Sequence, residues 1–215
     1  MELRNINILI ILHFGTLGGA QRQALGLAKY LVEERNCTID LFLMHSDFQT
    51  KEFREFTVAA KIRNTYHFGE SYLYLPYEVS YRNLRRIKWN LTYLLKVRKG
   101  LIANNYSISI PYLNHTSKLS YFIYKMIPSI KTTFWHQLGL DHLKKDMLEK
   151  YVAYHIPFVI GNAPNCFDIF KKEYPLPASK LNLLPQNLTL KKVLKDKVAI
   201  RKSLNIPNEV IIIGM

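Results

Sequence analysis

Apolar runs alternate with amphipathic segments along most of the chain. Residues 6–12 are almost all Ile and Leu, which is typical of a strand buried on both faces of a parallel sheet. A glycine-containing loop follows this run. Beyond it Ala24, Leu27, Ala28 and Leu31 recur at helical spacing. The first unit is therefore predicted to be a strand, a loop and a helix.

The same alternation continues over the next 150 or so residues. Further strands are predicted at 38–44, 107–112, 131–136, 157–160 and 181–184. Helices are predicted at 20–34, 81–103, 117–126, 144–154 and 163–173. Strands that alternate with helices predict right-handed crossovers, so we expect an α/β fold with a doubly wound, mostly parallel, Rossmann-like sheet.

The last stretch of the chain has a different character. A basic helix is expected at 191–204, and the segment Ile206-Pro207-Asn208 leads from it into an apolar strand at 210–214. We expect residues 1–190 to form one domain, and residues 191–215 to hold a linker and the first strand of a second domain. An additional edge strand of the first sheet is the alternative.

The first residues resemble a secretory signal, with Arg4 before an apolar run. Asn7 and His13 interrupt that run, and a helix that continues the fold follows it. Apolar stretches also fall short of the roughly 18 residues needed to span a bilayer. We therefore expect a cytoplasmic protein, placed at the inner face of the cell membrane if it contacts one.

The formal net charge of +14 favours an anionic partner. Nucleic acid, an acidic membrane surface and a phosphorylated substrate all satisfy this condition. Charge alone does not choose between them.

In an open parallel sheet, ligands bind beyond the carboxyl ends of the strands, so the loops that follow strands carry the candidate sites. The first loop, residues 13–20, contains Gly18 and Gly19, whose backbone N–H groups can approach an anionic or hydroxyl-rich ligand. Its glycine spacing matches neither a dinucleotide fingerprint nor a Walker loop. A merely tight strand-to-helix turn is the alternative.

Two further loops present a polar side chain. His136 closes a predicted strand, where it can hydrogen-bond a ligand hydroxyl, titrate near neutral pH, or be purely structural. Asn162 follows another strand, and with Pro164 in the first turn a helix cap is the favoured interpretation. The segment 185–187 after the last strand fits a simple turn.

The helix expected from Tyr81 is strongly basic and carries no acidic residue. Its basic residues are Arg82, Arg85, Arg86, Lys88, Lys96, Arg98 and Lys99. Its apolar stripe is predicted to be Leu84, Ile87, Leu91 and Leu94. A solvated helix face explains the charges. Together with Tyr72, Tyr74, Tyr77 and Tyr81, they also suit a surface for an anionic membrane, with Arg82, Arg85, Arg86 and Lys88 as its contacts.

Several short segments, in their order and spacing, resemble the N-terminal domain of the retaining glycosyltransferases of family four. They are Gly18-Gly19-Ala20-Gln21-Arg22-Gln23, Trp135-His136-Gln137, Ile160-Gly161-Asn162-Ala163, Ser179-Lys180-Leu181 with Pro185-Gln186-Asn187, and the entry into the last strand through Ile206-Pro207. Gln21 stands where the family usually has glutamate, and residues 186–188 replace a common Asn-Gly. Residues 48–99 match nothing in the family.

The resemblance implies one of the two facing Rossmann-like domains of the GT-B fold, and transfer of a sugar with retention from a nucleotide sugar. It implies that Gly18, Gly19 and Asn162 face the donor and acceptor cleft, and that His136 is a catalytic residue contacting the transferred sugar. The expected acceptor is a glycan or a lipid-linked molecule, in bacterial surface polysaccharide synthesis. No metal or cofactor is expected.

The family's acidic pair and its main diphosphate-binding cations belong to the second domain. The chain by itself is therefore expected to be inactive.

Three other classes of protein are alternatives to a transferase. A non-catalytic domain that binds an anionic membrane surface or a polyanion fits the charge and the tyrosines. A nicotinamide-dependent oxidoreductase has the right fold class but needs a different glycine pattern and a ribose-binding acid. Nucleic-acid binding is not expected, because neither a helix-turn-helix nor an aromatic sheet motif is present.

Overall fold

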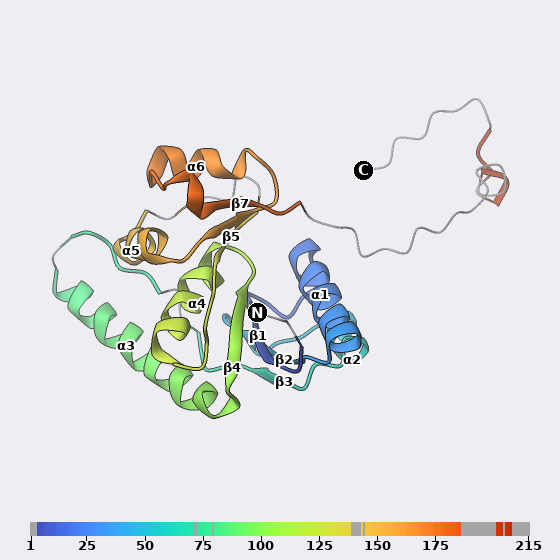
Figure 1. The fold of residues 1–215 in the computed structure, drawn as a ribbon, viewed down its shortest axis with the longest axis horizontal. Helices are drawn as coiled ribbons and strands as arrows, with labels where there is room; N and C mark the ends of the chain where they lie inside the picture. Colours follow the sequence, from blue (N-terminus) through green and yellow to red (C-terminus); the bar gives the residue numbers. More distant parts are fainter. Residues whose placement is uncertain are drawn as a thin grey trace.

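The computed structural model describes residues 4–70, 73–78, 80–138, 143, 145–185, 201–203 and 205–207 (Figure 1). Its strands are β1 (Asn7–Leu12), β2 (Thr38–Leu43), β3 (Asn64–Tyr66), β4 (Tyr106–Pro111), β5 (Trp135–Gln137), β6 (Val159–Gly161) and β7 (Leu181–Leu183). Its α-helices are α1 (Gly19–Arg35), α2 (Lys51–Ala59), α3 (Tyr81–Leu101), α4 (Asn114–Met126), α5 (Met147–His155) and α6 (Cys166–Glu173), with short 3-10 turns at Ile102–Asn104 and Ala178–Lys180.

All the strand pairs are parallel, and they form a four-stranded sheet in the order β3-β2-β1-β4 and a three-stranded sheet in the order β5-β6-β7. A single parallel bridge between Ile108 and Thr132 joins β4 to the chain entering β5. Within it, Lys131 N donates to Ser107 O at 2.8 Å. The predicted doubly wound, Rossmann-like fold class is confirmed, with its sheet divided between β4 and β5.

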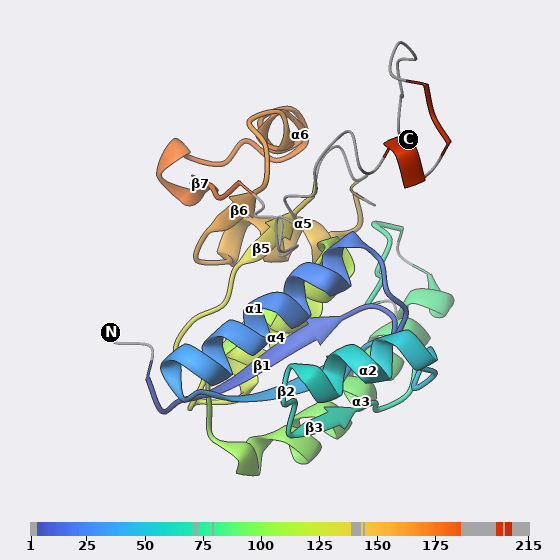
Figure 2. The same cartoon turned by 90° about the vertical axis from the view of Figure 1, so that its right-hand side faces the viewer.

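Helices cover both faces of the larger sheet. Alternate residues of β1 point to opposite faces: Ile8 and Ile10 pack in the core under α1 and α2, and Leu9 and Ile11 pack under α3 and α4. Figure 2 shows α1 and α2 in front of this sheet and the fainter α3 behind it. Burial on both faces explains why β1 is apolar at nearly every position.

The break between the two sheets is bridged by buried hydroxyl groups. Ser120 of α4 lies with its Oγ 2.6 Å from Ser109 Oγ on β4 and 2.6 Å from Thr133 Oγ1 on the segment before β5. The predicted strand 131–136 is accordingly short: the chain makes one bridge at Thr132 and forms the regular strand β5 only from Trp135.

Two elements, α2 and β3, were not predicted from the sequence. Helix α2 buries only Phe53 and Thr57, and its start is fixed by Thr50, whose Oγ1 accepts from Phe53 N at 3.3 Å. Strand β3 is a short, largely exposed edge strand. It is held beside β2 because the buried Asp40 carboxylate accepts from the Arg63 guanidinium and from Asn64 N.

The predicted apolar stripe of α3 is wrong in part. The face that packs on the core consists of Asn83, Tyr93, Leu94, Val97 and Leu101. Of the predicted stripe only Leu94 is buried, whereas Leu84, Ile87 and Leu91 are exposed. The helix is apolar on two faces, and hydrophobic periodicity does not say which one meets the sheet.

The predicted loop 185–187 beyond Pro185 and the predicted strand 210–214 lie outside the described residues. So does the expected boundary at residue 190.

Candidate functional site

The parallel topology brings the carboxyl ends of the strands to one edge. From β1 the chain passes to β2 and β3 on one side, and it places β4 on the other side of β1. The connections therefore diverge between β1 and β4. In an open α/β sheet this divergence opens a crevice outside the strand ends, where ligands bind.

Imidazole and aromatic rings gather at this edge. We call His13, Phe14, His45 and His115 the imidazole cluster. His13 and Phe14 follow β1, His45 follows β2, and His115 lies in the first turn of α4 after β4. The His13 and His115 rings are stacked with centroids 5.4 Å apart, and His13 lies 5.4 Å from His45 and 4.1 Å from Phe14.

The cluster is accessible from solvent. Phe14 is exposed, and the three histidines are half-buried. The Glu70 carboxylate lies 3.2 Å from His45 Nδ1. Rings that are fixed on one side and open on the other can pack against the C–H face of a ligand while their nitrogens donate to or accept from hydroxyl groups.

His136 lies in β5, on the other side of β4 from the cluster. Its ring meets Tyr112, which follows β4, edge to face at a centroid distance of 4.9 Å. Its backbone N donates to Ser117 Oγ at 2.9 Å. These contacts from β4 and α4 hold His136 at the same edge as the imidazole cluster.

The environment of His136 decides its protonation state. Burial lowers the pKa of His136 from 6.5 to about 4. Its Nδ1 is buried with no hydrogen-bond partner among the described residues. At neutral pH the ring is therefore uncharged. The interpretation that His136 titrates near neutral pH, one of those that the sequence allowed, is wrong.

The three glycines in the loop after β1 differ in their surroundings. Gly15 is required sterically, since a Cβ there would lie 2.5 Å from Phe48 O. Gly18 N donates to Gln21 Oε1 at 3.2 Å, so Gln21 caps the start of α1 much as a glutamate would. Gly19 is exposed, and a Cβ there would meet nothing within 4 Å. The first N–H groups of α1 consequently open toward the strand-end edge.

Asn162 lies at the same edge, beyond β6. Helix α6 begins at Cys166, later than the predicted residue 163, after turns that start at Ala163. The helix-cap interpretation is wrong for Asn162: the N-cap of α6 is Asn165, and Asn162 Oδ1 accepts from the Cys166 thiol at 2.9 Å rather than from a backbone N–H.

The basic side chains predicted as a membrane or anion surface lie elsewhere, on α3. Arg82, Arg85 and Lys88 are exposed, and Arg86 is half-buried. The Arg86 guanidinium stands over the Tyr74 ring at 5.5 Å and donates to Asn83 Oδ1 at 3.0 Å. These residues lie on α3 outside the sheet, on the side where the strands end.

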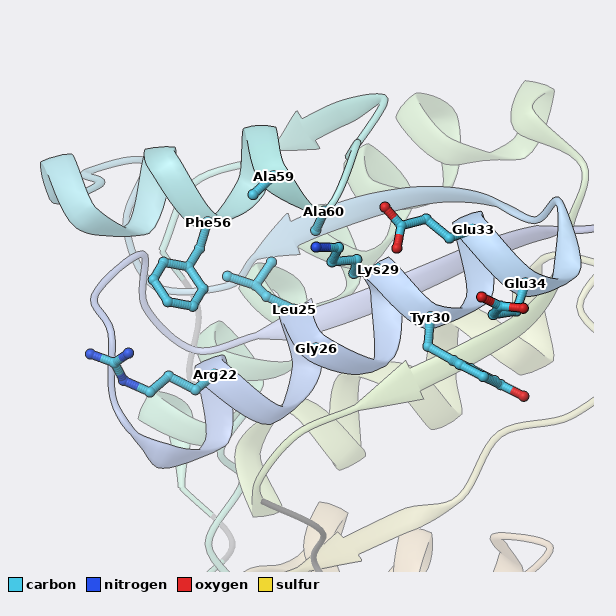
Figure 3. Close-up of a pocket in the computed structure, with 10 residues that line it drawn as sticks. All are labelled: Arg22, Leu25, Gly26, Lys29, Tyr30, Glu33, Glu34, Phe56, Ala59 and Ala60. Atoms are coloured by element: carbon cyan, nitrogen blue, oxygen red, sulfur yellow. The ribbon is translucent and has the colours of Figure 1, made fainter. Parts of the chain in front are cut away.

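A hollow of about 390 Å3 lies between α1 and α2 on the outer layer of the fold (Figure 3). Arg22, Lys29, Tyr30, Glu33 and Phe56 are among its lining residues. It is bounded by the sides of two helices rather than by strand ends. The imidazole cluster therefore remains the candidate site.

Two absences apply to the part of the chain that the structure describes. There, no three His, Cys, Asp or Glu side chains come close enough together to hold a metal ion. Within the same residues, no helix has the length and apolarity needed to cross a bilayer.

The fold is shared with solved glycosyltransferase structures. One is the Anabaena protein Alr3699/HepE in complex with UDP-glucose, with a TM-score of 0.62 and 14% identity over 94% of this chain and 50% of that one. A glycosyltransferase from Rickettsia africae matches with a TM-score of 0.61 and 14% identity over 96% of this chain and 51% of that one. The lipopolysaccharide outer core galactosyltransferase WaaB matches with a TM-score of 0.60 and 12% identity over 87% of this chain and 47% of that one. This chain thus has the Rossmann-like fold of a GT-B glycosyltransferase domain and spans about half the length of those proteins.

Sequence comparison adds nothing to this likeness, because no protein-family model and no curated protein matches the chain.

Sequence reasoning singled out His136 but not His45 or His115, and it treated His13 only as part of a loop. Each of these histidines lies within about four residues of the end of a predicted strand. That position was an available signal. Their proximity to one another was not, because it depends on the strand order.

Proposed function

We propose that this chain is the acceptor-side, N-terminal domain of a glycosyltransferase that moves a sugar from a nucleotide-sugar donor to a glycan or lipid-linked acceptor with retention. Bacterial surface polysaccharide synthesis is the proposed setting. The imidazole cluster at the divergence of β1 and β4 carries this proposal. Its support is the position of these rings at the edge where α/β sheets bind ligands.

The chemistry of the cluster suits a sugar. A pyranose presents C–H faces and a rim of hydroxyl groups, and the cluster offers aromatic faces together with nitrogens that both donate and accept. The exposed N–H groups at the start of α1, beside Gly18 and Gly19, suit the phosphates of the donor.

We assign His136 a hydrogen bond to the transferred sugar. Because burial keeps the ring neutral at pH 7, one ring nitrogen accepts and the other donates, and the ring carries no charge. Nδ1 is buried and has no partner among the described residues, and a buried polar atom of this kind needs one, which we assign to a ligand hydroxyl. A role as a general base is less suitable, since a pKa near 4 makes the ring a weak base.

Catalysis needs charge stabilisation that these rings do not supply. The leaving nucleoside diphosphate develops negative charge, and its stabilisation is a large electrostatic term. The proposal places that function, and the main donor contacts, in a second domain. We expect the chain alone to be inactive and the complete enzyme to require no metal.

The test uses this chain joined to the polypeptide that follows it in frame. Release of UDP and other nucleotides is measured from a panel of nucleotide sugars, with and without acceptor extracts. His136→Asn keeps a polar side chain of similar reach and is expected to lower donor turnover by about tenfold or more, as loss of one buried substrate hydrogen bond does. His155→Asn, on an exposed histidine at the end of α5, is the matched control.

Thermal melting of each variant separates a folding defect from a site defect. Donor-specific turnover that falls in His136→Asn and persists in His155→Asn supports the proposal. No turnover of any donor by the joined protein overturns it. Inversion at the anomeric carbon of the product would overturn retention alone.

The alternative that the sequence left open, a domain that binds an anionic membrane surface or a polyanion without chemistry, rests on different residues. Those residues are on α3, and they support an inference of their own.

A further inference from the structure

Helix α3 exposes an apolar stripe that the domain does not cover. The stripe consists of Leu84, Ile87, Leu91 and Leu95, which are 64%, 39%, 55% and 60% exposed. Spacings of three and four residues place them in one line along the helix. The buried face of the same helix is a different set, centred on Tyr93, Leu94 and Val97.

Basic residues lie beside this stripe, and Trp89 lies beyond them, roughly 120° or more around the helix from the leucines. At about 100° per residue, Lys88 and Arg85 fall between the leucines and Trp89 on the helix surface. Trp89 is 59% exposed, and the Arg85 guanidinium stands 4.7 Å above its ring. No Asp or Glu occurs in α3 to offset the charge.

These features together distinguish the possible occupants. A merely solvated helix face would not expose a line of leucines. A polyanion would pair with the cations and leave the apolar side chains in water. A second copy would bring another strongly basic chain, with a formal charge of +14, against the same face.

We propose that α3 docks in the plane of a lipid bilayer that contains anionic lipids. The stripe Leu84, Ile87, Leu91 and Leu95 enters the acyl boundary, and Arg85, Lys88 and their basic neighbours contact lipid phosphates. This arrangement matches both the apolar and the charged parts of the helix at once.

Docking does not depend on the proposed sugar transfer, but it has a consequence for it. The crossover from β3 to β4 places the start of α3 on the side where the strands end, and α3 lies on the outside of the fold (Figure 1). If the transferase proposal holds, docking brings the imidazole cluster toward the membrane surface, where a lipid-linked acceptor resides.

The test measures binding of the full chain to vesicles of phosphatidylcholine, with and without 30% phosphatidylglycerol, at 0.1 M and 0.5 M NaCl. Co-sedimentation gives the partition coefficient.

Two double variants separate the components of the surface. Arg85→Glu/Lys88→Glu removes two cations, each worth about fivefold in partition, and is expected to lower partitioning by about 25-fold or more. Leu84→Gln/Leu91→Gln is expected to reduce partitioning similarly while leaving the charge unchanged. Lys51→Glu/Arg54→Glu changes the same charge on exposed positions of α2, across the sheet, and is the matched control.

We expect both α3 variants to lose binding, and the α2 control to retain it. We also expect the unsubstituted chain to lose binding with neutral vesicles and at 0.5 M NaCl. Equal binding to neutral vesicles overturns the proposal. Binding to heparin or nucleic acid without binding to vesicles assigns the surface to a polyanion and also overturns it. A dimer in solution that Leu84→Gln/Leu91→Gln dissociates, together with no vesicle binding, assigns the stripe to a second copy instead.

Discussion

Lys118 Nζ on α4 donates to Asp146 Oδ2 at 2.9 Å, and both side chains are fully buried. Asp146 is also the N-cap of α5, where its Oδ1 accepts from Leu148 N and Glu149 N. One carboxylate therefore starts α5 and neutralises a lysine inside α4. Helix α4 packs on both β4 and β5. The ion pair therefore links α5 to a helix that contacts both sheets.

We predict that Lys118→Met lowers the free energy of unfolding by about 3–5 kcal/mol, because it leaves the Asp146 carboxylate buried and unpaired. Lys118→Met/Asp146→Asn should recover much of the loss, since asparagine is neutral and also caps helices. Urea denaturation followed by circular dichroism measures both. Lys171→Met, at the exposed pair with Asp168, is the control and should change stability by less than about 1 kcal/mol.

The glycine loop after β1 offers a second prediction. Gly15→Ala should destabilise the domain by about 1–3 kcal/mol, because the added Cβ would collide with Phe48 O and the side chain of Gln49. Gly19→Ala is at the first helical position with open space, and should leave stability unchanged or raise it slightly. Thermal denaturation of the two variants compares them directly.

Gly19→Ala also tests the ligand assignment of the loop. In the complete protein, a methyl group beside the first N–H groups of α1 should weaken nucleotide-sugar affinity while the melting temperature is unchanged. Calorimetric titration with the donor measures this, and an unaltered affinity would contradict the placement of Gly19 at the ligand.

His136 predicts a specific pH dependence of stability. Burial lowers the pKa of His136 to about 4 in the folded chain, against 6.5 when unfolded, so the unfolded state binds more protons between these values. Its contribution to stability is complete above pH 6.5 and is lost as the pH falls toward 4, with a limiting slope of about 1.4 kcal/mol per pH unit. Unfolding free energies measured from pH 7 to pH 4 give the slope.

In His136→Asn this part of the slope should disappear, whatever the substitution does to stability at pH 7. A variant profile parallel to that of the unsubstituted protein would show that His136 is not buried as a neutral ring.

Two buried tyrosines should respond oppositely to removal of the hydroxyl group. Tyr106 OH donates to Asp40 Oδ2 at 2.5 Å, so Tyr106→Phe takes a donor from a buried carboxylate and should cost about 1–3 kcal/mol. Tyr93 OH has no hydrogen-bond partner within the described part of the chain, so Tyr93→Phe should be neutral or stabilising. Chemical denaturation of the pair checks the difference, and equal losses would be inconsistent with these hydrogen bonds.

The sequence predicted elements best where burial imposes a simple pattern. Strand β1 was evident because burial on both faces makes it uniformly apolar, and α1 was evident because it has a single apolar face. Helix α2 and strand β3 were missed because they lie near the edge of the fold and bury few side chains. Their stability comes from Thr50 and from the Asp40 contacts, which no periodicity reveals.

Helix α3 shows the limit of periodicity differently. Its existence was predicted, but its apolar residues form two stripes, and only packing on the sheet separates the core face from the exposed one. The exposed stripe became visible only with the helix in place.

For the candidate site, the sequence by itself determined the residue types and their position after strands: His13 after β1, His45 after β2 and His136 in β5. Tertiary structure decided that β4 lies beside β1, which brings His115 within 5.4 Å of His13 although about a hundred residues separate them. It also decided the neutral state of His136, since burial lowers the pKa of that ring. Strand order and burial are properties of the assembled core, because each depends on contacts between segments far apart along the chain.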